Sequence, residues 1–336
     1  MEGEKRLPFV CTVVLSYGLI DDTIQSLNSL QSLIAIQQQI IVVQNGALED
    51  ELNKIETLFP GIHIIRNGKN IGGAAGRNLG IRCAITYNPD YLFFLDNDAT
   101  VASTALQELI LVSEENPQAG FLGCIVYCKS EPKKIMSAGA FIERSLVDVH
   151  ILQVDRKLKF FEVDYIPSCS MLVPIKTIAL TGELDSRLFV YDEDLDWCLR
   201  GRKSGLKTLV VTKAAAYHKD TQQKIKHPMR IYYGMRNRLT VAKRRGLFLS
   251  IWEKNVLHYL FSASFKTLRS NSETSFMVFI AIWTGFFHFL KGRLGKGPHF
   301  LDRPAEAFSE VRVRRKLMKT PLYSALRYLK HLLLMH

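Results

Sequence analysis

Apolar runs and amphipathic segments alternate along the first part of the chain. The apolar runs are continuous enough to predict strands buried on both faces, at residues 9–17, 40–45, 62–67, 91–95 and 121–127. Helices are predicted between the first four runs, at residues 21–36, 48–59 and 72–87. Strands and helices that alternate through short polar joints predict a parallel sheet with right-handed crossovers, and therefore an α/β fold.

The pattern changes after the fifth run. Residues 135–174 alternate more loosely and contain turn residues, which favours antiparallel strands on an otherwise parallel sheet. A further strand is predicted at residues 206–218. The pattern therefore predicts a nucleotide-binding α/β half joined to a mixed second half.

Two carboxylates follow directly on the apolar run of residues 91–95. Asp96 and Asp98 are two residues apart, so their side chains point the same way in extended backbone. Open α/β sheets bind ligands at the carboxyl ends of their strands. Two carboxylates there suit a hard divalent cation that also holds substrate phosphates. The alternative is a strand followed by a simple Asn/Asp turn.

A cluster of small residues at 70–78 opens the helix before this strand. It is neither G-x-G-x-x-G nor a Walker A sequence, so neither a dinucleotide fold nor a P-loop kinase is indicated. Small residues at a helix start let the backbone approach a ligand, and the helix N-terminus favours a diphosphate. Taken alone, however, the cluster is better explained by tight helix–strand packing.

A second acidic cluster lies at residues 191–200, where four carboxylates within five residues open a predicted helix. Negative charge suits the helix dipole, but capping explains only one or two of the four. Crowded carboxylates raise one another's pKa, which suits a general base. His218 ends the strand predicted at 206–218, where a histidine is either a third metal ligand or a satisfied structural residue.

Together these segments resemble the family 2 glycosyltransferases, inverting enzymes of the GT-A fold, and within them the bacterial rhamnosyltransferase-like and galactofuranosyltransferase-like group. The resemblance covers about residues 8–245 and depends on eight motifs in order: VVLSYG (13–18), IIVVQNG (40–46), NIGGAAGRNLGI (70–81), FFLDND (93–98), SCSML (168–172), TGELDSRLFVYDEDLDWCLR (181–200), YH (217–218) and YYGMRNRL (232–239). It implies a GT-A nucleotide-diphospho-sugar transferase fold with a mixed, mostly parallel sheet and a Rossmann-like N-terminal half. The implied domains are a catalytic domain at 1–245 and a helical extension at 246–336.

The resemblance also implies roles for individual residues. Asp96, Asp98 and His218 match the ligands of Mg²⁺ or Mn²⁺. Arg236 and Asn237 match an Arg-Asn pair that is expected near the diphosphate. The positions expected to contact the nucleotide sugar are Ser16, Tyr17, Asn45, Asn70, Gly72, Gly73, Asn78, Asp96 and Arg236.

The implied reaction is a single in-line displacement with inversion. Asp194 matches the catalytic base, which removes a proton from an acceptor hydroxyl that attacks opposite the leaving diphosphate. Glu193 and Asp196 stay open as alternatives, because sequence spacing does not rank the three carboxylates.

Three positions depart from the family pattern. The first strand ends in Tyr17-Gly18 where Tyr-Asn is usual, and Gln44 replaces a carboxylate after the second strand. These changes leave the nucleotide base and the donor open. Arg77 stands where small or aromatic residues are common, and its guanidinium either pairs with the diphosphate or faces solvent.

Composition agrees with a folded globular protein. The chain has 336 residues, of which 47% are hydrophobic and 23% charged, as in ordinary globular proteins. Six cysteines without C-x-x-C spacing predict core residues in a reducing compartment and no structural zinc site. The charged first residues lead directly into a strand, so we expect no signal peptide and a cytoplasmic protein.

Positive charge is concentrated in the last third. Residues 1–220 carry 22 Lys and Arg against 27 Asp and Glu, whereas residues 221–336 carry 22 against 5. This asymmetry predicts a surface that seeks anions, either nucleic acid or lipid headgroups.

Aromatic residues in the same third favour lipid. Residues 276–290 carry no formal charge but are too few to span a membrane. With residues 247–265 and the basic tail 311–336 they fit helices that lie in the membrane interface. We therefore expect peripheral contact with the anionic cytoplasmic face of the cell membrane. The alternative is packing on the catalytic domain or on a second subunit of a homo-oligomer.

Three functions remain open. The first is a glycosyltransferase that builds cell-surface polysaccharide on a saccharide or lipid-linked glycan acceptor. Its first expected donor is dTDP-rhamnose, and its second is UDP-galactofuranose or another UDP-hexose. A nucleotidyltransferase lacks support because no Lys-bearing glycine loop follows the first strand. The acidic catalytic half argues against the third function, a nucleic-acid-binding protein, so we expect no nucleic-acid partner.

Overall fold

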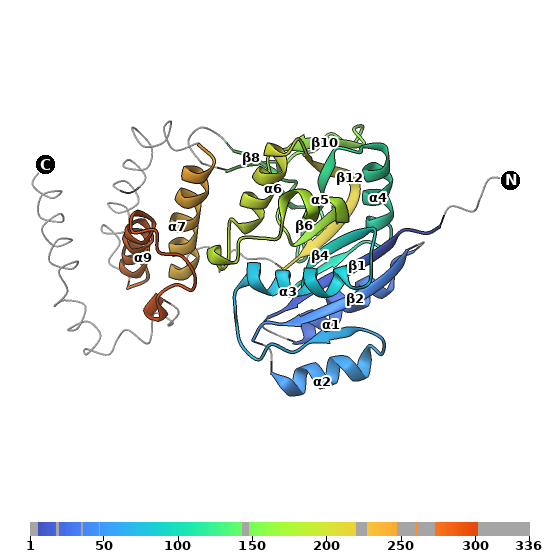
Figure 1. The fold of residues 1–336 in the computed structure, drawn as a ribbon, viewed down its shortest axis with the longest axis horizontal. Coiled ribbons are helices and arrows are strands. Elements are labelled where there is room, and N and C mark those ends of the chain that lie inside the picture. Colours follow the sequence, from blue (N-terminus) through green and yellow to red (C-terminus); the bar gives the residue numbers. More distant parts are fainter. Residues whose placement is uncertain are drawn as a thin grey trace, which may run out of the picture.

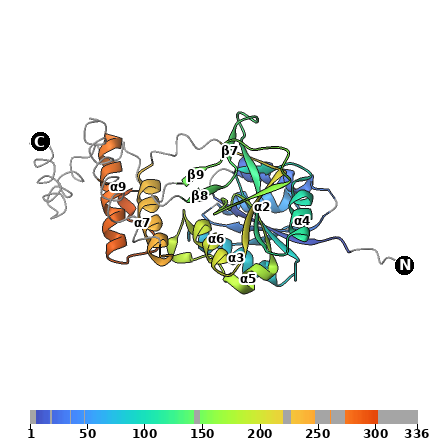
Figure 2. The same cartoon turned by 90° about the horizontal axis from the view of Figure 1, so that it is seen from above.

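A central mixed sheet carries helices on both faces, and two further helices lie side by side at one end of the molecule (Figures 1 and 2). This computed structural model describes residues 6–17, 20–34, 36–46, 48–142, 148–219, 227–246, 260 and 273–301. The strand order along the main path is β10-β12-β6-β11-β4-β1-β2-β3.

The N-terminal half has the predicted alternation. Its elements are β1 (Phe9–Ser16), α1 (Ile20–Gln31), β2 (Gln37–Gln44), α2 (Glu49–Leu58), β3 (His63–Ile65), α3 (Gly73–Ile85) and β4 (Tyr91–Asp96). All pairings among β4, β1, β2 and β3 are parallel. The prediction of a parallel α/β half is therefore confirmed.

The second half is mixed, as predicted. It contains β5 (Ala99–Val101), α4 (Ala105–Glu115), β6 (Ala119–Cys128), β7 (Ile135–Ser137), β8 (Ala140–Ile142), β9 (Asp148–His150), β10 (Phe160–Val163), β11 (Ser170–Pro174), α5 (Ile175–Thr181), η1 (Ser186–Leu188), α6 (Glu193–Lys203) and β12 (Lys207–His218). β11 inserts antiparallel between β4 and β6, and β12 runs parallel to β6. The helix α4 was not predicted.

Alternate residues of the strands feed two apolar clusters on opposite faces. β1 gives Cys11 and Val13 to one cluster and Val10 and Val14 to the other. The first cluster includes residues of α3 and α6, and the second includes residues of α1 and α4. All six cysteines are free and five are buried, which agrees with the expected core role.

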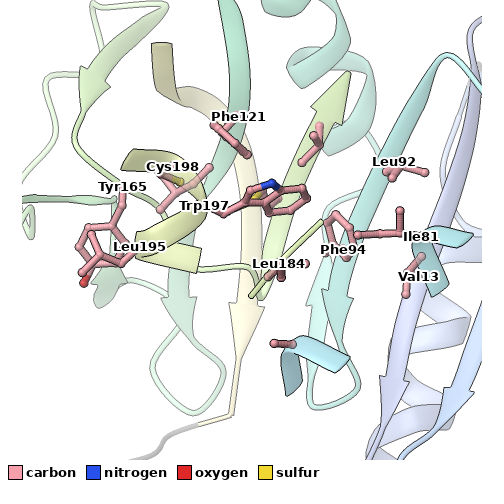
Figure 3. Close-up of a cluster of buried hydrophobic side chains, with 14 of the residues drawn as sticks. Val13, Ile81, Leu92, Phe94, Phe121, Tyr165, Leu184, Leu195, Trp197 and Cys198 are labelled. Atoms are coloured by element: carbon pink, nitrogen blue, oxygen red, sulfur yellow. The ribbon is translucent and has the colours of Figure 1, made fainter. Parts of the chain in front are cut away.

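Trp197 ties α6 to the sheet. Its indole meets Phe94 of β4 edge-on at 5.7 Å between ring centroids and Phe121 of β6 at 5.2 Å (Figure 3). The indole N–H donates to Oγ1 of Thr181 at 2.9 Å. Phe94 precedes Asp96 by two residues, so this packing fixes the start of α6 relative to the end of β4.

The C-terminal helices α7 (Pro228–Arg244) and α9 (Glu273–Leu290) pack against each other. Buried residues of α9 include Met277, Phe279, Ile282 and Phe286. For this helix, the alternative of packing within the protein therefore describes the structure better than an open aromatic face. In the described part of the chain, no helix has the length and apolar character needed to cross a membrane. The tail 311–336 and all of 247–265 except residue 260 lie outside the described residues.

Candidate active site

Three predicted metal ligands meet at the ends of β4 and β12. β12 runs antiparallel to β5, and this pairing sets His218 opposite Ala99. The Nε2 atom of His218 lies 3.1 Å from Oδ1 of Asp98 and 3.6 Å from Oδ2 of Asp96. Nδ1 of the same ring donates to the carbonyl oxygen of Lys219 at 2.8 Å, which turns Nε2 toward the carboxylates.

This cluster fits a divalent cation. One ligand atom from each of the three side chains lies within 4.8 Å of the others. Two carboxylates and an imidazole are donors that Mn²⁺ and Mg²⁺ sites use. Burial disfavours the imidazolium, but hydrogen bonds to Asp96 and Asp98 outweigh it and raise the pKa of His218 to about 10. A bound cation would replace that positive charge.

Arg77 joins the two acidic motifs. Its side chain is only 9% exposed, with Nη2 2.6 Å from Oδ1 of Asp96 and Nη1 3.2 Å from Oε1 of Glu193. Burial by itself raises the pKa of a carboxyl group, but the Arg77 charge and the His218 hydrogen bond hold the pKa of Asp96 far below its usual value. Of the two alternatives for Arg77, facing solvent is wrong.

Two of the four clustered carboxylates are neutralised by other arginines. Nε of Arg238 lies 2.9 Å from Oδ1 of Asp192. Asp196 is 1% exposed and pairs with Arg200 through Oδ2 at 2.9 Å and with Arg245 through Oδ1 at 2.5 Å. Asp196 is therefore a structural ion-pair partner and not a candidate base.

Glu193 and Asp194, at the start of α6, are the two remaining carboxylates of the cluster, and both have a raised pKa. Burial and the nearby Asp194 charge raise the pKa of Glu193 to about 8. Burial also raises the pKa of Asp194, although both of its oxygens accept backbone hydrogen bonds, Oδ2 from Ser168 at 3.1 Å and Oδ1 from Leu195 at 2.8 Å. A carboxylate with a raised pKa and a fixed orientation suits a base.

The residues predicted to line the nucleotide lie at the ends of β1 and β2. Tyr17 is 59% exposed, whereas Asn45 is buried. Oδ1 of Asn45 accepts from the Ile71 N–H at 3.0 Å, and Oδ1 of Asn70 accepts from the Gly72 N–H at 2.8 Å. These amides hold the 70–72 loop, and contact with a nucleotide stays a prediction for them. Ser16 is also buried and Gly73 starts α3.

Tight packing explains Gly76 and Gly80 of α3 and Gly72 just before it. A Cβ on Gly80 would lie 2.3 Å from Cγ1 of Val13, and a Cβ on Gly76 would lie 2.4 Å from Cδ1 of Leu15. Gly72 has a φ of +95°, and a Cβ there would meet the carbonyl oxygen of Phe189 at 2.5 Å. The packing explanation is therefore confirmed for this helix.

Two side chains that were predicted to contact the nucleotide sugar form hydrogen bonds with the protein backbone. The Asn78 amide donates to the carbonyl oxygen of Leu184 at 2.8 Å and accepts from its N–H at 3.1 Å. Arg236 is 0% exposed, and its guanidinium donates to Leu188 and Gly295 carbonyl oxygens at 2.9 and 2.7 Å. Both side chains bind backbone in this structure, so contact of Asn78 with the nucleotide sugar and of Arg236 with the diphosphate stays a prediction. The sequence motifs identified these two positions but did not predict which groups their side chains would hydrogen-bond.

Known structures establish the fold. The chain matches GalNAc-T7, solved with UDP, GalNAc and Mn²⁺, with a TM-score of 0.57 and 13% identity over 86% of this chain and 57% of that one. It matches the mannosyltransferase PcManGT from Pyrobaculum calidifontis, solved with GDP-Man and Mn²⁺, with a TM-score of 0.58 and 9% identity over 86% of this chain and 88% of that one. The fold is that of the GT-A glycosyltransferases, as predicted.

Sequence comparison shows which families the chain resembles. Residues 13–173 match the model of glycosyl transferase family 2. The dTDP-rhamnosyl transferase RfbF of Shigella flexneri is 22% identical over 259 residues, 73% of this chain and 84% of the relative. An uncharacterized glycosyltransferase of Haemophilus influenzae is 30% identical over 110 residues, 33% of this chain and 36% of the relative. The chain is therefore similar to glycosyl transferase family 2 and to a nucleotide-sugar transferase of that kind, which agrees with the family that the motifs predicted.

Proposed function

We propose that this enzyme transfers a sugar from a nucleoside diphosphate sugar to an acceptor hydroxyl with inversion at the anomeric carbon, and that it depends on a divalent metal. The observation that carries the proposal is the link through Arg77 between Asp96, in the Asp96–Asp98–His218 cluster, and the carboxylate pair Glu193–Asp194. Metal ligands and a candidate base in one site are what such a displacement requires.

The chain's own residues divide the chemistry. Asp96, Asp98 and His218 would hold Mg²⁺ or Mn²⁺, which would supply charge neutralisation for the departing diphosphate. Asp194 takes the proton of the acceptor hydroxyl while that oxygen bonds to the anomeric carbon and the bond to the diphosphate breaks. The backbone N–H groups of Ser168 and Leu195 orient the Asp194 carboxylate for this transfer.

The relatives support one choice of sugar donor. dTDP-rhamnose is the first candidate, because the chain covers 84% of a relative named as a dTDP-rhamnosyl transferase. UDP-galactofuranose or another UDP-hexose is the second. The acceptor we propose is a saccharide or lipid-linked glycan of a cell-surface polysaccharide.

A donor screen tests the proposal. Purified enzyme is incubated with each nucleotide sugar and Mn²⁺, Mg²⁺ or EDTA, and release of the nucleoside diphosphate is measured. Proton NMR of the transferred sugar then reports the anomeric configuration. Asp194→Asn should lower turnover at least about 100-fold, in the range that general bases contribute, and more than Glu193→Gln does. Near-normal turnover of Asp194→Asn would make the base assignment wrong.

We also propose that the basic C-terminal region touches the anionic cytoplasmic leaflet. The charge of residues 221–336 supports this contact. The test compares the full chain with one that ends at Leu301, by sedimentation with vesicles of phosphatidylglycerol or phosphatidylcholine. Binding of the full chain to neither vesicle type would refute it.

A further inference from the structure

The segment that leads into the acidic motif has an unusual backbone. Phe189, Tyr191 and Asp192 have φ values of 71°, 66° and 64°. Non-glycine residues enter this left-handed region rarely and at a cost, so surrounding contacts must hold them there. Glu193 and Asp194 follow immediately, so the conformation of this segment sets where both carboxylates lie.

The contacts that hold the segment come from α7. Nδ2 of Asn237 lies 2.9 Å from the carbonyl oxygens of Leu188 and Val190 and 2.8 Å from that of Tyr191. Nη2 of Arg236 donates to the same Leu188 oxygen at 2.9 Å. One buried amide therefore bonds to three carbonyl oxygens within four residues.

The two clamping side chains are themselves fixed. Both are 0% exposed, and Nε of Arg236 donates to Oδ1 of Asn237 at 2.9 Å. The guanidinium also lies 5.0 Å from the ring centroid of Tyr233, and that ring stacks on Phe189 at 5.5 Å with an interplanar angle of 12°. Burying a guanidinium is costly, which argues that its donors are used to set backbone and not merely to fill space.

The clamp reaches beyond α7. Nη1 of Arg236 donates to the carbonyl oxygen of Gly295 at 2.7 Å and to the hydroxyl of Tyr232 at 3.1 Å. That hydroxyl lies 2.7 Å from Nδ1 of His288 on α9. His288 and Gly295 therefore belong to the same hydrogen-bonded unit as the loop before the acidic motif.

We propose that Arg236 and Asn237 are positioning residues. They hold residues 188–192 in a conformation, left-handed at Phe189, Tyr191 and Asp192, that delivers Glu193 and Asp194 to Arg77 and Asp96. The proposal deepens the proposed function, since it rests on Asp194 acting as the base. It replaces the expected diphosphate contact of Arg236 with a role in the chemical step.

The test uses Arg236→Lys and Asn237→Ser in the full chain. The matched control is Arg244→Gln, because Arg244 lies on the same helix and pairs with Asp185 at 2.6 Å but is not part of this clamp. Four quantities are measured: kcat and KM for the donor, binding of the nucleoside diphosphate with Mn²⁺ by calorimetry, the pH profile of kcat, and hydrogen exchange of peptides that span 188–199.

The clamp predicts a split between these readouts. In both clamp variants kcat should fall about 100-fold, which is the cost of about 1 Å of misplacement. The Kd of the nucleoside diphosphate should change less than about threefold by the same reasoning, since the donor site is not touched. Exchange over 188–199 should become faster. The acid limb of the kcat profile should move to lower pH, because burial no longer raises the pKa of Asp194. Arg244→Gln should match the wild type in all four.

Two results would overturn the proposal. Weaker binding of the nucleoside diphosphate with an unchanged kcat would make Arg236 a diphosphate ligand, as the motif had suggested. Unchanged exchange over 188–199 in both variants would show that the segment does not need the clamp. Exchange needs no substrate, so it still decides about the clamp if the wild-type enzyme transfers no sugar, and only the proposed function then fails. Should Arg236→Lys not fold, Asn237→Ser decides alone.

Discussion

Replacing Arg77 by Met should destabilise the protein through one buried charge. The guanidinium lies between Asp96 and Glu193, whose side chains are 29% and 5% exposed. Removing one partner of a buried ion pair costs about 3–5 kcal/mol. Unfolding entropy is roughly 2.1 cal/mol/K per residue, so 336 residues give about 0.7 kcal/mol/K. The melting temperature should therefore fall by about 4–7 °C.

The stability lost through Arg77→Met should increase with pH. The pKa of Glu193 is raised in the folded protein to about 8, so its contribution to stability is present below its ordinary pKa and is lost as pH rises through about 8. Arg77 counteracts this because its charge favours the ionised carboxylate. Without Arg77 the folded-state pKa rises further, so Arg77→Met should lose more stability between pH 6 and pH 9 than the wild type does.

The assay is thermal unfolding at pH 6 and pH 9, with and without Mn²⁺. Arg82→Met is the matched control, because Arg82 lies on the same helix and its pair with Glu183 is 64% exposed on the Arg side. That exposed pair should be worth at most about 1 kcal/mol. Mn²⁺ should raise the melting temperature of Arg77→Met more than that of the wild type, since Oδ1 of Asp96 is released. Equal losses for the two variants, or a loss independent of pH, would refute the reasoning.

Three further variants probe the site and its supports. Asp98→Asn should weaken Mn²⁺ binding by at least about tenfold in calorimetry, as removal of supporting groups at metal sites does, and an unchanged affinity would remove Asp98 from the site. Trp197→Ala should lose about 3–5 kcal/mol in urea unfolding, because the indole is fully buried between two rings. Gly80→Ala should cost about 1–3 kcal/mol, since its Cβ would meet Val13, and a neutral change would mean that α3 shifts freely.

Pattern and spacing predicted the parts of the site that depend on strand ends. The apolar run before Asp96 predicted a buried strand, and the carboxyl ends of parallel strands gather at one edge of the sheet. His218 joins this edge because β12 pairs with β5. The sequence predicted the strand at residues 206–218 but not the strand that it pairs with.

Side-chain directions could not be predicted in the same way. Asn78 and Arg236 stand at motif positions, yet their donors are taken by carbonyl oxygens of Leu184 and Leu188. Those carbonyl oxygens lie about 50 residues or more away in sequence and become available only once α3 and α7 pack against the 184–191 segment. Likewise, the apolar face of α9 predicts burial, but sequence does not tell a lipid surface from α7 as the cover.

The placement of α7 bears on how much of the chain the reaction needs. Residues 13–173 match the family model, and they include the Asp96–Asp98 pair but neither Asp194 nor His218. The segment before Asp194 is bonded to Arg236, and Arg236 is bonded to Gly295. A domain boundary near residue 245 would therefore separate the Gly295 carbonyl oxygen from the Arg236 guanidinium that donates to it. By this reasoning the described residues after 273 are part of the catalytic unit. A membrane contact is therefore expected from segments whose binding to lipid does not separate α9 from α7.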